Sequence, residues 1–415
     1  MQPEEQSPVV RRDPYAALRF RDFRLLIVGR FVAQIGEMMV SVGVGWELYE
    51  RTSDPLALGL VGLVQIIPVI LFSVPGGYIA DRYNRKRITL ITQIILMVCS
   101  LLLAIISITR GSLLVIYTLL AIIGAARAFN NPAESALTPQ TVPQDHYFSA
   151  AAWGSSVWQL SAILGPALGG LIIGITNHAY MVYIANVIAG GVLVLMLLLI
   201  RSQQREYAEA GEPPLQAIKA GWSFLRRSQI IFSSITLDMF AVLFGGATFL
   251  LPIFAKDILQ VDAAGLGILR AAPSVGALMM AVFLARRPPM QHAGITLLLA
   301  VAGFGVATIL FGLSTSFWLS LAMLFTLGAL DNISVVIRHT LVYTHTPDSM
   351  RGRVGAVNSV FIGASNELGG FESGVAAALL GPVGAVVFGG FGTLLVVGII
   401  ARLAPQLRQY GTLGK

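Results

Sequence analysis

The sequence has little of what water-soluble proteins contain in abundance. Charged residues make up 12% of the 415-residue chain, whereas soluble domains carry about 25%. Cys99 is the only cysteine, which excludes an intrachain disulfide framework and a thiolate metal cluster. The sequence also has no nucleophile–base arrangement, no His/Cys metal spacing and no phosphate-binding loop. It therefore predicts no enzyme, no bound metal and no nucleotide-driven pump.

Long apolar runs take the place of these features. Hydrophobic residues make up 55% of the chain, and the mean hydropathy is +0.76. Runs near 20 residues, the length that crosses a bilayer, recur along nearly the whole sequence. We expect an all-α polytopic membrane protein with twelve transmembrane helices. The predicted spans are about 24–49, 57–80, 88–109, 112–133, 149–175, 179–200, 230–255, 264–285, 293–312, 317–342, 354–378 and 381–401.

The spans divide the chain into two six-helix halves. We expect a cytoplasmic N-terminal segment at 1–23, a first bundle at 24–200, a cytoplasmic linker with an amphipathic segment at 201–229, a second bundle at 230–401 and a cytoplasmic tail at 402–415. The net charge of +7 could suggest a nucleic-acid partner. The Lys and Arg residues lie in short loops instead of on one face of a soluble domain, so we expect no nucleic-acid partner.

The same cations predict the topology. One set of loops carries Arg82, Arg85, Lys86, Arg87, Arg286, Arg287, Arg351 and Arg353, together with the cations of the linker and of both chain ends. The opposite loops carry only Arg51, Arg110 and Lys256. Because cytoplasmic loops are enriched in Lys and Arg, both termini are predicted to be cytoplasmic.

The two halves repeat each other in sequence. The Gly-x5-Pro pattern of Gly62–Pro68 in the second span recurs at Gly267–Pro273 in the eighth. Gly124 and Pro143 are separated by the same number of residues as Gly328 and Pro347. A polar linker between such halves is typical of transporters built from parallel repeats.

The second span ends in a motif that carries both small and charged residues. Within Gly76–Arg87, the spacing Gly-x3-Asp-Arg-x2-Arg is formed by Gly77, Asp81, Arg82 and Arg85. A small Gly permits close approach of helices, and an acid at the membrane edge can pair with a cation or cap a helix N-terminus. We predict that these four residues gate conformational change. The alternative is an ordinary basic loop.

The fifth span carries a run of small residues. Its pattern is Gly154-x6-Ser161-x3-Gly165-Pro166-x2-Gly169-Gly170. It resembles the antiporter signature of major facilitator exporters, with Ser161 in place of one Gly. Small residues allow tight packing and Gly-Pro sets a local bend, so we add Gly154, Gly165 and Pro166 to the predicted gating residues. Generic helix packing is the alternative.

Charges inside the spans are the most informative pattern. A charge at the bilayer centre costs at least about 2.5 kcal/mol, so these side chains should face a cavity or a partner. Glu37 is our first candidate for the proton-coupling acid, Asp238 the second and Glu367 the third. The predicted residues of a substrate cavity are Arg30, Arg127, Glu134, Arg270, Asp331, Arg338 and Glu372. Fixed ion pairs that hold helices together are the alternative for each of them.

Spacing adds detail to these charges. Arg30 and Glu37 are seven residues apart, as are Arg127 and Glu134. Seven residues return to nearly the same helix face about 10 Å away. The two members of a pair are too far apart to bond within their own helix, so their partners must come from other helices.

Several stretches together resemble the enterobactin-exporter-like branch of the major facilitator superfamily. Besides the two motifs above, they are Ala128–Ala133, Phe244–Ala247, Arg270–Ala277, Pro347–Val354 and Asn366–Gly369. The resemblance covers about residues 14–405. It implies the major facilitator fold, in which helices 1, 4, 7 and 10 line a central cavity.

The resemblance also implies a function. We expect a proton-coupled antiporter that exports an amphipathic organic solute, such as a siderophore or a drug, across a bacterial inner membrane. The expected partners are the small-molecule substrate, protons and membrane lipid. We expect a monomer that has no cofactor and takes its energy from the proton gradient. A lysophospholipid flippase, a uniporter or an importer on the same scaffold is the alternative. The family does not identify the substrate.

Overall fold

The computed structural model describes residues 13, 15–201, 214–288 and 290–413. Among these residues, eleven helical segments are long and apolar enough to cross a bilayer. The last of them, Phe361–Leu403, changes direction at Gly381, whose φ of 75° and ψ of 163° lie outside the helical region. It therefore contains two spans, and the prediction of an all-α protein with twelve membrane helices is confirmed. Arg11 and Arg12 of the N-terminal segment lie outside the described residues. So do residues 202–213 of the expected linker.

The first half contains six spans joined by short turns. Its membrane helices are α1 (Arg21–Thr52), α2 (Pro55–Arg82), α3 (Arg85–Thr109), α4 (Leu113–Leu137), α5 (Tyr147–Thr176) and α6 (Tyr180–Leu199), with short 3-10 turns η1 (Ala16–Arg19), η2 (Thr138–Thr141) and η3 (Gln144–His146). Polar residues define where helices begin. The Asp54 carboxylate accepts from Leu56 N at 2.9 Å before α2, and Asn84 accepts from Arg87 N at 3.1 Å before α3.

The second half begins after an amphipathic helix, α7 (Pro214–Arg227). Its remaining elements are α8 (Gln229–Phe244), η4 (Gly246–Leu250), α9 (Leu251–Ile253), the π-helical η5 (Phe254–Ile258), α10 (Ala263–Ala285), α11 (Ala293–Leu313), α12 (Phe317–His345), α13 (Asp348–Leu403) and α14 (Pro405–Arg408). The span predicted at 230–255 is therefore not one regular helix, because it changes its winding after Phe244.

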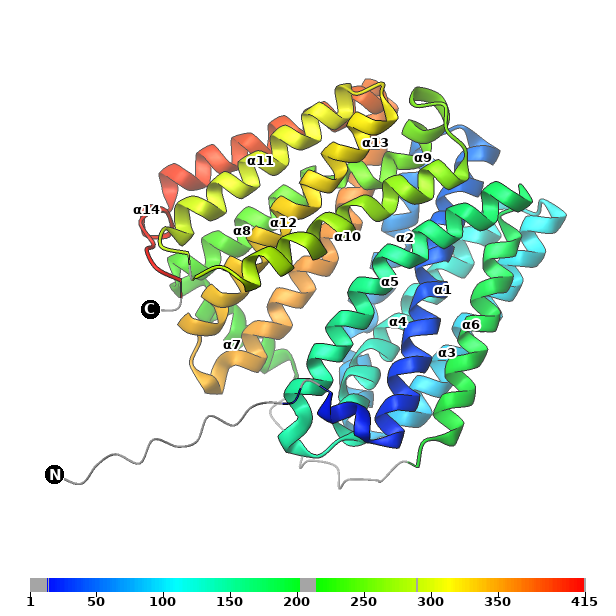
Figure 1. Cartoon of the computed structure of the whole chain (residues 1–415), viewed down its shortest axis with the longest axis horizontal. Helices are drawn as coiled ribbons and strands as arrows, with labels where there is room; N and C mark the ends of the chain where they lie inside the picture. Colours follow the sequence, from blue (N-terminus) through cyan, green and yellow to red (C-terminus); the bar gives the residue numbers. More distant parts are fainter. Residues whose placement is uncertain (1–12, 14, 202–213, 289, 414–415) are drawn as a thin grey trace.

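The two halves form two bundles that lie side by side (Figure 1). They meet where α2 packs on α13 and where α5 packs on α10. A Cβ atom on Gly62 would lie 2.5 Å from the Glu367 carbonyl oxygen, and one on Gly267 would lie 2.9 Å from Gly170 Cα. These two glycines occupy equivalent positions of the sequence repeat, so the repeat places a backbone-to-backbone crossing on each side of the interface.

Equivalent residues of the sequence repeat also make equivalent contacts within the two halves. A Cβ on Gly124 of α4 would lie 2.5 Å from the Gln65 carbonyl oxygen on α2. A Cβ on the equivalent Gly328 of α12 would lie 2.5 Å from Pro273 Cα on α10. The fourth helix of each half thus packs closely on the second, and α4 and α12 occupy equivalent places.

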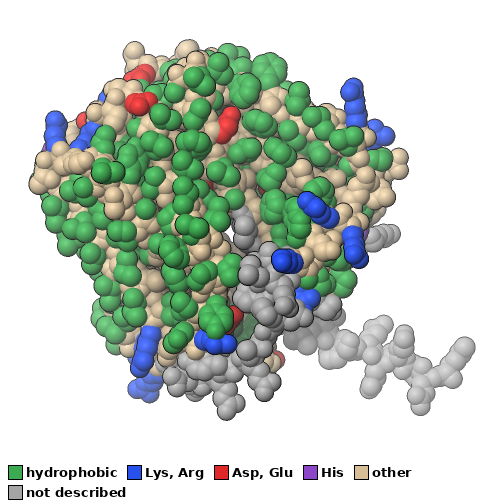
Figure 2. Space-filling view, turned by 180° about the vertical axis from the view of Figure 1, so that it is seen from behind, with side chains coloured by type: hydrophobic (Ala, Val, Ile, Leu, Met, Phe, Trp, Pro, Cys, Tyr) green, Lys and Arg blue, Asp and Glu red, His purple; other side chains and the backbone are tan. Residues whose placement is uncertain are grey.

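The outer surface is that of a membrane protein. Large apolar side chains are highly exposed on it, for example Leu114 at 73% and Leu379 at 78%. Figure 2 shows a face covered largely by hydrophobic side chains, with most charged side chains towards its edges. A water-soluble monomer seldom exposes so broad an apolar surface, whereas a bilayer covers it.

The contacts between the halves gather at one end of the molecule. Gly45 lies against Pro252, Gly59 against Gly374, and Gly174 against Ala264. These residues lie towards the ends of the spans that are remote from α7. Figure 1 shows the two bundles diverging towards the α7 end. The conformation is therefore closed at the end opposite α7.

Candidate functional site

A cavity of about 130 Å³ lies between the two halves. Its apolar wall consists of aliphatic residues from α1 to α4 and Phe249 of η4. Its polar lining residues are Glu37, Ser41, Gln65, Ser100, Arg127, Asn186, Arg270 and Glu367. An apolar wall with a few converging polar groups is the usual form of a small-molecule site.

Arg127 is the centre of the polar contacts that the first half makes in this cavity. Its Nη2 lies 3.3 Å from Glu37 Oε2, and its Nη1 donates to Gln65 Oε1 at 3.1 Å. The three side chains come from α4, α1 and α2. Because both ions remain partly exposed to the cavity, with side-chain exposures of 32% for Arg127 and 24% for Glu37, a ligand can reach them.

A second ion pair joins the same two helices further towards the α7 end. Arg30 of α1 pairs with Glu134 of α4, and Arg30 Nη1 also donates to Thr138 Oγ1 at 3.3 Å. Asn130 Nδ2 donates to Glu134 Oε2 at 3.3 Å. The helices are antiparallel, so the seven-residue spacing on each places one pair about two turns from the other. Arg30 and Glu134 do not line the central cavity.

The second half contributes Arg270 and Glu367 to the cavity. Arg270 reaches across to α1, where Nη2 donates to Ser41 Oγ at 2.7 Å and Nη1 donates to the Ser41 carbonyl at 3.3 Å. Glu367 lines the cavity together with Arg127 and Arg270. The cavity thus holds two acids and two arginines, drawn from both halves.

The other charged residues predicted for a substrate cavity lie elsewhere. Arg338 pairs with Asp238 in the interior of the second half, where the two side chains are 4% and 8% exposed. Asp331 lines a separate small cavity beside Asp238. Glu372 accepts from Ser373 Oγ at 3.4 Å. The structure therefore brings together Glu37, Arg127, Arg270 and Glu367, and it separates the remaining predicted residues from them.

The motif after α2 ties that turn to α4. Arg85 donates from Nε to the Ala80 carbonyl at 3.3 Å and from Nη1 to the Ala136 carbonyl at 3.2 Å. Arg82 lies over the Tyr78 ring with its Cζ 4.3 Å from the ring centre, and Asp81 is exposed. The close approach expected at Gly77 is wrong for this conformation, since a Cβ there would meet nothing within 4 Å. The neighbouring Gly76 packs on the Ala128 backbone instead.

The small residues of α5 have two different neighbours. A Cβ on Gly165 would lie 2.9 Å from the Ile35 carbonyl of α1, whereas Gly170 and the Pro166 carbonyl contact Gly267 of the other half. A Cβ on Gly154 would meet nothing within 4 Å. The motif therefore combines packing within the first half with a crossing between halves, and Gly154 takes part in neither in this conformation.

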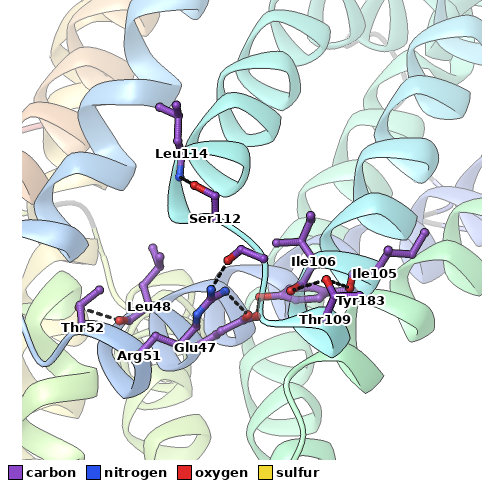
Figure 3. A network of polar contacts seen from close by, with 11 residues as sticks. Glu47, Leu48, Arg51, Thr52, Ile105, Ile106, Thr109, Ser112, Leu114 and Tyr183 are labelled. Atoms are coloured by element: carbon purple, nitrogen blue, oxygen red, sulfur yellow. Dashed lines mark hydrogen bonds and ion pairs between the residues drawn. The ribbon is translucent and has the colours of Figure 1, made fainter.

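A network near the closed end was not among the predicted sites. Figure 3 shows Arg51 between Glu47 and the turn after α3. Arg51 Nη1 lies 3.2 Å from Glu47 Oε1, Arg51 Nη2 donates to the Gly111 carbonyl, and Tyr183 Oη donates to Glu47 Oε2 at 2.8 Å. Close to it, Tyr49 donates to Asp257 of η5 and so links the halves. Glu47 lies near the end of a span, where hydropathy does not mark an acid as unusual.

Comparisons with known proteins identify the family to which the chain belongs. The family model for the transmembrane secretion effector, of the major facilitator type, matches residues 12–412. The chain belongs to this family. It is 26% identical over 395 residues to the enterobactin exporter EntS of Escherichia coli O1:K1, covering 94% of this chain and 93% of that protein. The same figures hold for the enterobactin exporter EntS of Shigella boydii serotype 18.

Solved structures share the fold of this family member. A bacterial homolog of the human lysosomal transporter Spinster, in an inward-facing and occupied conformation, aligns with a TM-score of 0.75 at 14% identity, covering 96% of this chain and 99% of that one. A POT family transporter in complex with a thioalcohol-conjugated peptide aligns with a TM-score of 0.74 at 13% identity, covering 93% and 96%. The family and these neighbours are transporters and not enzymes, as the sequence predicts.

Proposed function

We propose that this protein exports an amphipathic organic solute, such as a siderophore or a drug, from a bacterial cytoplasm in exchange for protons. The observation that carries the proposal is the central cavity, in which Glu37 and Arg127 of one half face Arg270 and Glu367 of the other. The similarity to enterobactin exporters over nearly the whole chain supports outward transport.

The proposed transport cycle follows from the contacts between the halves. In this conformation they meet at the end opposite α7. The loops on the α7 side carry Arg85, Lys86, Arg87, Arg286 and Arg287, which favours a cytoplasmic location for that side. We therefore assign the conformation to the state that receives solute from the cytoplasm, with both termini on that side. The halves then rock about the cavity to release the solute outside.

Protons enter the cycle at the cavity acids. Glu37 is the first candidate because its carboxylate meets Arg127 in the cavity, where a proton or a solute can replace that contact. Protonation of Glu37 would free Arg127 to make other contacts. Glu367 is the second cavity acid, whereas Asp238 is held by Arg338 away from the cavity. A bound proton and a bound solute change the same set of contacts, which is the requirement for coupling.

The test is transport by the purified chain in proteoliposomes with an imposed pH gradient and panels of siderophores and drugs. We expect solute movement that follows the gradient in the wild type and is lost in Glu37→Gln, which keeps the shape of the side chain without its titration. Glu50→Gln changes an exposed acid on the same helix and serves as the control. Wild-type movement that ignores the gradient would contradict proton coupling and leave a uniporter or a flippase.

A further inference from the structure

The second half repeats the charges of the first half with their signs reversed. Three and ten residues after Gly124 are Arg127 and Glu134, and the same positions after Gly328 are Asp331 and Arg338. On α4 both charges have partners on α1, as described above. On α12, Arg338 pairs with Asp238 of α8, so that Asp238 takes the place that Arg30 has in the first half.

The partner of Asp331 is missing from this arrangement. Glu37, the partner of Arg127, lies seven residues after Arg30. The position seven residues after Asp238 is Gly245, which has no side chain and at which α8 gives way to η4. Within the part of the chain that the structure describes, Asp331 makes no ion pair and no hydrogen bond.

A small cavity lies where the partner would be. It has a volume of about 10 Å³, enough for one water-sized particle. Asp238, Asp331 and Ser334 line it, together with apolar residues that include Val301 and Phe304 of α11. The Ser334 side chain is 97% buried, and its Oγ has no hydrogen-bond partner among the described residues. A buried hydroxyl without a partner points to a missing ligand.

The charges around the cavity do not balance. The Asp238 carboxylate is neutralised by Arg338, and the Asp331 carboxylate adds one negative charge. The residues of α11 that face the cavity are apolar. Arg270 of the neighbouring α10 is directed to Ser41 in the central cavity. One negative charge therefore remains in a part of the molecule that the bilayer surrounds, where charges are paired or serve a function.

We propose that this cavity is a binding site for one monovalent cation, held by the Asp331 carboxylate and Ser334 Oγ beside the Asp238 carboxylate. Carboxylate and hydroxyl oxygens are suitable ligands for a hard cation, and a single positive charge completes the pattern that Glu37 and Arg127 show in the first half. The cation is Na⁺ or a proton, because both neutralise one carboxylate. The site is separate from the central cavity and does not depend on which solute the protein moves.

The test is thermal unfolding of the purified full-length protein in detergent, without any transported solute. At fixed pH and ionic strength, NaCl replaces choline chloride; in a second arm without Na⁺, the pH is lowered from about 8 to about 6. We expect the wild-type Tm to rise and saturate in one of these arms, since a ligand that binds only the folded state stabilises it. Asp331→Asn should abolish a response to Na⁺, and it should reduce a response to pH, to which other titratable groups of the chain also contribute. If the Na⁺ arm responds, Ser334→Ala should raise the half-saturating concentration about 10-fold, the loss expected for one oxygen that contacts a charge.

Glu372→Gln is the matched control, because it removes another acid of the same half outside this cavity and should keep the response. A wild-type Tm that responds in neither arm overturns the proposal, as does a response that Asp331→Asn leaves unchanged. Because the assay contains no solute and measures no transport, its result does not depend on whether the protein exports a solute. Failure of transport in proteoliposomes with an intact Asp331-dependent response would contradict only the proposed function.

Discussion

The Glu47 carboxylate is buried near the closed end and depends on two donors from different parts of the chain. Arg51 supplies one at 3.2 Å and the Tyr183 hydroxyl supplies the other at 2.8 Å (Figure 3). The Tyr183 side chain is 1% exposed, so water cannot replace its hydroxyl. A hydrogen bond to a charged group contributes more than one to a neutral group, and a buried group left without its partner is costly.

Tyr183→Phe is therefore expected to lower the free energy of unfolding by about 1.5–3 kcal/mol, because it removes a donor to a charge and keeps the ring. Tyr117→Phe provides the comparison, since Tyr117 donates to the neutral Ala57 carbonyl at 2.9 Å. Its loss should cost about 0.5–1.5 kcal/mol. Thermal unfolding of the two variants in detergent measures the difference. Equal losses would show that Glu47 does not use this hydroxyl as a charge partner.

Residue-level prediction from the sequence located charges but not their pairings. The seven-residue spacing of Arg30 and Glu37 indicated partners on other helices, and the structure places those partners on α4. Which helix supplies a partner depends on tertiary packing, which spacing along one helix does not contain. Ser41 illustrates the limit, because a serine in an apolar span gives no sign that Arg270 of the other half will reach it.

Helices were the easiest elements to predict, because a bilayer requires long apolar runs with all backbone groups bonded internally. The exception is the seventh span, whose composition is as apolar as that of a regular helix. A Cβ on Gly245 would lie 2.7 Å from Phe304 Cε1 of α11, so a side chain at this position would displace the Phe304 ring. Hydropathy carries no information about such contacts between helices or about the change of winding after Phe244.

Gly76 and Gly77 are adjacent at the end of α2, and replacing each with alanine distinguishes the effect of packing on stability from that of helix propensity. Alanine favours a helix over glycine by about 1 kcal/mol at either position. At Gly77 its Cβ enters open space, whereas at Gly76 it meets the Ala128 backbone. We expect Gly77→Ala to keep or raise the Tm and Gly76→Ala to lower it, as measured by thermal unfolding of the two variants in parallel.

The same two variants also report on the motif. If Gly77 packs closely only in the alternative conformation, Gly77→Ala will lose transport while its Tm is unchanged. A Gly77→Ala protein with normal stability and normal transport would remove Gly77 from the gating residues. A lower Tm for Gly77→Ala than for Gly76→Ala would contradict the packing of α2 on α4 described above.

The whole molecule is organised by a repeat that the sequence showed only in part. The fifth and eleventh spans both contain Gly-Gly-x3-Gly, at Gly169–Gly174 and at Gly369–Gly374. The last glycine of each run faces the other half, with Gly174 against Ala264 and Gly374 against Gly59. These crossings allow the two bundles to approach closely at one end, and bulky side chains there would keep them apart.

If transport requires the halves to separate at this end, a covalent link there should stop it. A Cβ on Gly174 would lie 3.1 Å from Ala264 Cβ, close to the 3.5–4.5 Å that a disulfide spans. In a Cys99→Ser background, Gly174→Cys with Ala264→Cys should abolish solute movement on oxidation, and reduction should restore it. Transport by proteoliposomes before and after reduction measures the effect.

A link within one half supplies the control for this experiment. A Cβ on Gly29 of α1 would lie 3.2 Å from Met196 Cβ of α6, so Gly29→Cys with Met196→Cys joins two helices of the same bundle. Rigid-body rocking leaves that distance unchanged, and oxidation of this pair should preserve transport. Loss of transport in both oxidised proteins would show that the bundles themselves deform during the cycle. Full transport with the Gly174–Ala264 link closed would mean that the halves do not open at this end.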